Sequence, residues 1–134
     1  MNTPNLHGTA LLRIGLGAIY IAHSLYLKLV VFTLPGTAAF FESIGLPAFL
    51  AYATFAVEAI GGIALVLGYH ARWAALALIP VALGATWAHS GAGWVFSNAG
   101  GGWEYPLFLA LATTVVALQG NGSLALQREK TVLE

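Results

Sequence analysis

The stretch GTALLRIGLGAIYIAHSLYLKLVVF, residues 8 to 32, decides the fold class of this 134-residue chain. Its only charged residues are Arg13 and Lys28, and the run is longer than the roughly 20 residues needed to cross the apolar core of a bilayer. Similar apolar runs cover residues 47 to 67, 72 to 90 and 103 to 119. The bilayer core offers no water to backbone amides, and these runs lack the alternation of barrel strands. The sequence therefore predicts four transmembrane helices.

The composition of the chain favours a membrane protein. Hydrophobic residues make up 59% of it and charged residues only 7%, whereas roughly a quarter of the residues of a soluble domain are charged. Five basic and five acidic residues give a net charge of zero, so no basic surface would attract nucleic acid. The chain has no cysteine, which excludes a disulfide or a thiolate metal site. We expect the lipid bilayer, and no nucleic acid, as a partner.

The length of the chain leaves room for one domain. We expect a single four-span domain over residues 1 to 122 and a short polar cytoplasmic tail over residues 123 to 134. Between the first two apolar runs, TAAFFESIGLP, residues 37 to 47, starts with a threonine that can cap a helix and ends with glycine and proline. This segment predicts a short helix lying flat in the outer interface. The expected fold class is an all-α integral membrane four-helix bundle with one interfacial helix.

The distribution of basic residues predicts the orientation in the membrane. An even number of spans puts both termini on the side of the short loop at residues 69 to 72, which holds Arg72. The connections at residues 33 to 46 and 91 to 102 hold no lysine or arginine. Lys28, near the outer end of the first span, is the one weak contrary signal. The positive-inside rule places both termini in the cytoplasm.

Charged groups within or at the edge of the spans define the candidate site. They are Arg13, Lys28, Glu58 and Glu104. Each would cost roughly 2.5 to 3.5 kcal/mol if it stood unpaired near the bilayer centre, so partners are expected. Helical periodicity puts Arg13 and Lys28 on one side of the first helix, with His23 beside them, and this side should face the bundle. Glu58 falls near mid-membrane, so we expect its partner to be His23 or Arg13.

Glu104 opens the fourth apolar run, where the first turn of a helix suits an acid. We expect it to meet Lys28, His89 or both at the outer side. The resulting polar cluster, a candidate ligand site, comprises His23, Lys28, Glu58, His89, Glu104 and Tyr105. Arg13 and Arg72 are expected to be structural charges. Two interpretations stay open, because polar residues in membrane bundles can bind a ligand or pin helix to helix. No Glu-x-x-His spacing is present, so no metal site is expected.

Several segments, taken in order, resemble the DoxX family of small bacterial membrane proteins. They are LLRIGLGAIYIAHSLYLKL at residues 11 to 29, ESIGLP at 42 to 47, EAIGGIALVLGYHARWAAL at 58 to 76, AHSG at 88 to 91 and GGGWEYP at 100 to 106. The resemblance covers roughly residues 10 to 122 and implies a four-helix bundle in the bacterial cytoplasmic (inner) membrane. The polar positions that the family pattern emphasises match Arg13, His23, Lys28, Glu58, Arg72, His89 and Glu104. Ser24 stands where glycine is commoner in the family.

The family takes its name from a small subunit of a thiosulfate:quinone oxidoreductase. The resemblance therefore implies an accessory subunit of a membrane redox system, and we expect a quinone near the outer side of the bundle. His23, His89, Lys28 and Tyr105 are candidate donors for the quinone carbonyls. The chain has no CxxCH, no GxGxxG and no thiol, so no covalent cofactor is expected and a partner protein subunit is needed. At most the chain is a non-catalytic or quinone-interacting subunit of an oxidoreductase complex.

Two other functions stay open. One is a non-catalytic membrane scaffold or small-molecule binding protein whose buried charges are structural. The other is a transporter, for which four spans give little room unless the chain forms a homo-oligomer.

Overall fold

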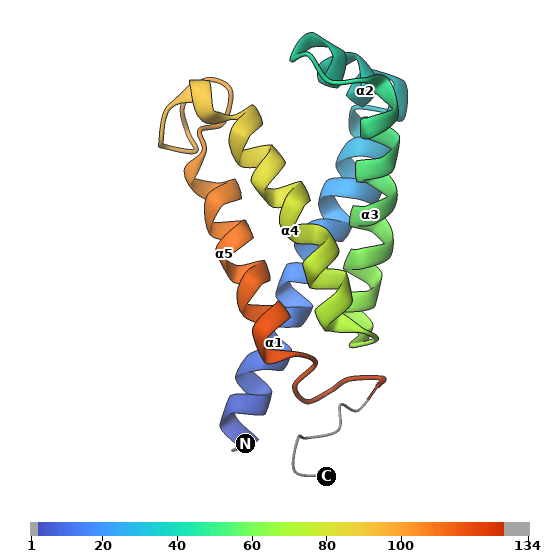
Figure 1. Cartoon of the computed structure of the whole chain (residues 1–134), viewed down its shortest axis with the longest axis vertical. Coiled ribbons are helices and arrows are strands. Elements are labelled where there is room, and N and C mark those ends of the chain that lie inside the picture. The colour runs from blue at the N-terminus through green and yellow to red at the C-terminus, as the bar shows by residue number, and fades with distance from the viewer. Residues whose placement is uncertain (1–2, 128–134) are drawn as a thin grey trace.

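The computed structural model describes residues 3 to 127, and within them every regular element is helical (Figure 1). In chain order these elements are α1 (Thr3–Ile21), η1 (Ala22–Val31), α2 (Leu34–Ser43), α3 (Ala48–Leu67), α4 (Ala71–Ala88), η2 (Ser90–Ala92) and α5 (Glu104–Gln119). The all-α membrane fold class is confirmed, including a short helix between the first two long ones.

Within residues 3 to 127, three stretches are long and apolar enough to cross a membrane: Asn5–Val31, Ala48–Leu67 and Ala71–Ala88. The fourth apolar helix, α5, has 16 residues. At about 1.5 Å per residue it is about 24 Å long, somewhat less than the roughly 30 Å apolar core of a bilayer. The chain is a helical membrane protein with three long apolar helices and a shorter fourth one beside them.

The helices form two groups that meet at one end of the bundle and diverge at the other (Figure 1). In the first group, α3 packs against α1 and η1, and α2 packs on α3; in the second group, α4 packs on α5. The groups are joined by contacts of α1 with α5 and of α3 with α4, near the end where α1 begins. Towards the end that holds α2, the α4 and α5 pair leans away from α2 and α3 (Figure 1).

Two glycines allow the close approach of α1 and α3. A Cβ added to Gly17 would lie 2.8 Å from the carbonyl oxygen of Gly62, and one added to Gly62 would lie 3.1 Å from that of Gly17. Around this crossing the core holds leucines and small residues, with Leu16, Leu65 and Leu78 buried. Small residues at a helix crossing allow the backbones to come close, which is how membrane helices gain dispersion contacts.

The C-terminal part of the first long helix is widened into a π-helix. η1 spans ten residues, and Phe32 N donates to Leu27 O at 2.8 Å in the same i to i−5 pattern. The buried Ser24 hydroxyl bonds back to this helix, to Tyr20 O at 2.9 Å and Ile21 O at 3.2 Å. π-Helical segments are rare and are frequent at functional sites. From Ala22 onward, the side chains depart from the α-helical periodicity that the sequence predicts.

The short helix α2 begins earlier than the sequence predicts. Its N-cap is Thr33, whose hydroxyl accepts from Gly36 N at 3.2 Å, so the expected cap at Thr37 is wrong. Thr37 lies within the helix instead, and its hydroxyl donates to Thr33 O at 2.8 Å. Leu34 and Pro35 are compatible with the first helical turn, where proline costs no hydrogen bond.

The segment after α5 folds back onto the bundle. Leu126 N donates to Leu67 O at 2.7 Å, and Gln127 N donates to Gly68 O at 3.1 Å. The side-chain oxygen of Asn121 accepts from Ala71 N at 3.2 Å, at the first residue of α4. The described part of the predicted tail, residues 123 to 127, is therefore bound to the ends of α3 and α4; residues 128 to 134 lie outside the described chain.

Candidate functional site

A cavity of about 920 Å³ lies between the two helix groups. One wall comes from η1, α2 and α3 together with the end of α1, and the other from α4, α5 and the loop before α5. Ligand pockets commonly measure about 300 to 1,000 Å³ and are mostly apolar with a few polar groups. The titratable side chains on the walls are Tyr20, His23, Lys28, Glu58, His89 and Tyr105.

Five of the six residues predicted for the polar cluster line this cavity. They are His23, Lys28, Glu58, His89 and Tyr105. They come from four elements, η1, α3, α5 and the C-terminal end of α4, which are far apart in the sequence. Glu104 is not among the lining residues.

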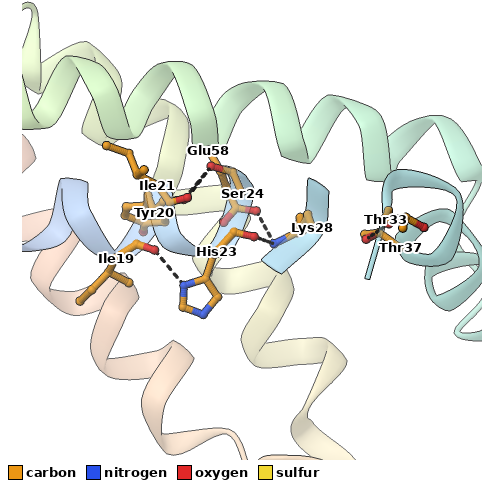
Figure 2. Close-up of polar contacts among 9 residues, drawn as sticks. All are labelled: Ile19, Tyr20, Ile21, His23, Ser24, Lys28, Thr33, Thr37 and Glu58. Carbon is orange, nitrogen blue, oxygen red and sulfur yellow. Dashed lines mark hydrogen bonds and ion pairs between the residues drawn. The ribbon is translucent and has the colours of Figure 1, made fainter. Parts of the chain in front are cut away.

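Lys28 and Glu58, which both line the cavity, form an ion pair. Lys28 Nζ lies 2.7 Å from Glu58 Oε1, and it also lies 3.5 Å from the carbonyl oxygen of His23 (Figure 2). Glu58 is 3% exposed, and its buried Oε1 has no hydrogen-bond partner in the described chain apart from this ion pair. Such a pair is costly to desolvate and costly to break, because removing one partner leaves a buried charge.

The prediction that Glu58 has a partner on the first helix is correct, but the predicted identity of that partner is wrong. The partner is Lys28, not His23 or Arg13. Periodicity placed Lys28 correctly on the side that faces the bundle, but the depth estimate left out the length of its side chain. The lysine reaches back along η1, and its Nζ lies 3.5 Å from the carbonyl oxygen of His23, the residue expected at the depth of Glu58.

Arg13 is fully buried and lies away from the cavity, on α1 beside the end of α3. Within the described chain its guanidinium donates only to backbone carbonyls: Nε to Asn121 at 2.7 Å, Nη1 to Leu65 at 2.6 Å, and Nη2 to Ser123 at 2.8 Å and Leu124 at 2.9 Å. Helix C-termini leave carbonyls without intrahelical partners, and a guanidinium presents five N–H donors in a fixed fork. Arg13 holds the segment after α5 against the end of α3.

Glu104 closes the loop that precedes α5. Its Oε1 accepts from Phe96 N at 3.0 Å, and its own backbone N–H donates to Trp94 O at 3.1 Å. The prediction that Glu104 meets Lys28 or His89 is therefore wrong. The loop folds back over the first turn of α5 and offers the carboxylate a backbone donor, while Lys28 is paired with Glu58.

In both histidines of the cavity, one ring nitrogen forms a hydrogen bond with a backbone carbonyl. His23 Nδ1 lies 2.9 Å from Ile19 O, and His89 Nδ1 lies 2.8 Å from Gly100 O. A carbonyl oxygen can only accept, so Nδ1 carries the proton and the neutral ring presents Nε2 as an acceptor. The sequence-based expectation that these histidines donate to a ligand carbonyl is therefore wrong for the neutral rings.

One ring contact connects the two walls of the cavity. The His23 ring on η1 stacks on the Tyr105 ring on α5, with centroids 6.2 Å apart and an interplanar angle of 24°. Deeper in the bundle, the Tyr20 hydroxyl lies 2.8 Å from Thr113 Oγ1, and Thr113 donates its own proton to Leu109 O at 2.6 Å. Tyr20 therefore donates to Thr113.

Arg72, predicted as a structural charge, is exposed in the first turn of α4, at the end away from the cavity. Within residues 3 to 127, no three histidine, aspartate or glutamate side chains lie close enough together to hold a metal ion.

Two residues that shape the cavity were not predicted as site residues. Pro80 and Gly84 lie one turn apart on α4 and line the same wall. A Cβ on Gly84 would meet nothing within 4 Å, so the wall is hollow at this point. The sequence signal was present, because a proline inside an apolar helix frees a backbone carbonyl and a glycine four residues later shares its face.

The comparisons with known proteins agree with this architecture. The DoxX family model matches residues 8–91, which include Lys28, Glu58 and His89. A protein of Bacillus subtilis (strain 168) with the name "Putative oxidoreductase CatD" is 34% identical over 119 residues, which cover 89% of this chain and 84% of that protein. No solved structure matches the chain significantly. Because the family match spans more than half of the chain, this protein belongs to the DoxX family of membrane proteins.

Proposed function

We propose that this protein is an accessory subunit of a redox system in the bacterial inner membrane and that it binds a quinone-class ring in the cavity. The observation that carries the proposal is the cavity itself, about 920 Å³ of mostly apolar space with an ion pair and two histidines on its walls. A quinone combines an apolar ring and tail with two polar oxygens, and such a cavity complements both parts.

The sequence relative supports a redox role. The Bacillus subtilis protein is named an oxidoreductase, and the match to it extends over most of both chains. This chain lacks cysteine and the motifs for attached haem or flavin, so electrons would leave the bound ring for a partner protein. The partner is a protein subunit that carries the redox centre, and association of several copies of this chain is compatible with the same role.

The proposed orientation follows from the basic residues. With four crossings, both termini and Arg72 face the cytoplasm, and the cavity opens towards the outer side. The 16-residue helix α5 then spans a locally thinner or indented part of the bilayer.

A variant that fills the cavity tests the proposal. Gly84→Leu adds a side chain at a cavity wall where a Cβ meets nothing within 4 Å, and leucine favours the helix more than glycine does. Gly15→Leu is the matched control, because Gly15 is exposed on α1, has the same free space and does not line the cavity.

The measurement is the quinone content of each protein purified in mild detergent, by solvent extraction and chromatography. We expect quinone with the wild type and with Gly15→Leu, and a clear loss with Gly84→Leu. Equal quinone in all three proteins, or none in the wild type, would contradict the proposal.

The alternative function is a membrane scaffold, and Arg13 is the observation that favours it. Among residues 3 to 127, that buried charge binds backbone carbonyls alone, which is a structural use of a buried charge. Under this alternative, the Lys28 and Glu58 pair only stabilises the bundle. Gly84→Leu would then not change the binding of any small molecule.

A further inference from the structure

The polar groups that line the cavity offer more free hydrogen-bond acceptors than free donors. His23 Nε2 and His89 Nε2 are acceptors in the neutral rings, because both Nδ1 protons are bound to backbone carbonyls. Neither Nε2 has a partner in the described chain. Glu58 adds a carboxylate whose buried Oε1 accepts only the Lys28 ammonium.

The donors near these acceptors are mostly engaged. The Lys28 ammonium contacts Glu58 and the carbonyl of His23, and the Tyr20 hydroxyl donates to Thr113. The hydroxyl of Tyr105 can donate or accept and therefore does not discriminate. Trp87, which carries an indole N–H, is 55% exposed at the other wall.

These acceptors fit the reduced form of the ring better than the oxidised form. A quinone offers only carbonyl oxygens, which would face the lone pairs of His23 and the carboxylate of Glu58 without a proton between them. A quinol offers two hydroxyl groups, and each of them can donate to such an acceptor. A buried acceptor that faces another acceptor loses its hydrogen bond with water and gains none in return.

We propose that the cavity binds the quinol, a 1,4-dihydroxybenzene ring, in preference to the quinone. This inference rests on the proposed function and adds the redox state of the ligand to it. With this preference, the ring that the protein takes up from the membrane or releases into it is the reduced one.

The test is a titration of the full chain in mild detergent under anaerobic conditions, with heat of binding as the readout. Three probes share one ring and tail: decylubiquinol, decylubiquinone, and the dimethyl ether of decylubiquinol, which has the reduced ring but no O–H donor. Two gained hydrogen bonds predict that decylubiquinol binds about tenfold more tightly than either of the others.

The outcomes separate the two proposals. If decylubiquinone binds as tightly as decylubiquinol, or more tightly, the quinol preference is overturned and the proposed quinone-class function stands. If the ether binds as tightly as decylubiquinol, the O–H groups are not recognised and the preference is overturned as well. If no probe binds, both proposals fail.

A histidine variant identifies the group that recognises the hydroxyl. His23→Phe removes the acceptor and keeps an aromatic ring beside Tyr105, so decylubiquinol affinity should fall several-fold while decylubiquinone affinity should not fall. His7→Phe is the matched control, because His7 is exposed and does not line the cavity. Equal losses for both probes in His23→Phe would overturn the assignment. If His23→Phe does not fold, His89→Phe makes the same comparison at the other wall.

Discussion

At the scale of single residues, the buried ion pair between Lys28 and Glu58 is the feature on which the site depends. The need for a partner of Glu58 on the first helix was predictable, because a lone carboxylate in the membrane is costly. The partner's identity was not predicted, because the long lysine side chain reaches back along η1 and brings its ammonium beside the His23 carbonyl, at the depth of Glu58. The partner of Glu104 was hidden in a different way: it is a loop amide, which any residue other than proline could provide.

The ion pair predicts a coupled effect of two substitutions. Glu58→Gln and Lys28→Met should each lower the melting temperature in detergent, since removing one member of a buried pair costs about 3 to 5 kcal/mol, and less where water reaches Lys28. The double variant should lose clearly less than the sum, because it leaves no unpaired charge. Glu42→Gln, at an exposed acid on α2, is the control and should change little. Additive losses would show that the two side chains do not depend on each other.

At the scale of elements, three of the four apolar helices that the sequence predicts follow the predicted bounds to within two residues. The predicted runs 47 to 67, 72 to 90 and 103 to 119 became Ala48–Leu67, Ala71–Ala88 and Glu104–Gln119. Glycine and proline at the ends of these runs indicated where the helices begin and end. The first helix begins at Thr3 rather than at residue 8, because a polar segment joins it without any break in the backbone pattern.

The fold-back of the segment after α5 depends on Arg13, and this gives a prediction at the element scale. In Arg13→Lys an ammonium with three donors replaces the fork that binds carbonyls in α3 and in the returning segment, so some of these carbonyls lose their partner. We expect lower thermal stability and faster hydrogen exchange at Leu126 and Gln127, with the amides of α2 as an internal reference. Unchanged exchange at those two amides would show that Arg13 does not hold the segment.

At the scale of the whole molecule, the cavity exists because the α4 and α5 pair diverges from η1, α2 and α3. The sequence predicted that polar residues of different helices would meet, and five of the six line this one space. It did not predict the divergence, because the angle between packed helices depends on how all of their side chains fit together. Pro80 and Gly84 were the only local signals of a hollow wall that we recognise in the sequence.

The orientation of the whole molecule is a separate prediction. Reporter proteins that are active only in the periplasm should be inactive when fused at the C-terminus and active when inserted in the loop at residues 91 to 102. An active reporter at the C-terminus would contradict the orientation, and with it the outward opening of the cavity.

The claim that a quinone-class ring occupies the cavity is tested most directly by photolabelling with an azidoquinone in membranes, followed by mass spectrometry of the labelled peptides. We expect saturable labelling of peptides that line the cavity, from η1, α4 and the start of α5, and its loss in Gly84→Leu but not in Gly15→Leu. Labelling that does not saturate and falls on outward-facing residues such as Trp73, which is 71% exposed, would contradict it.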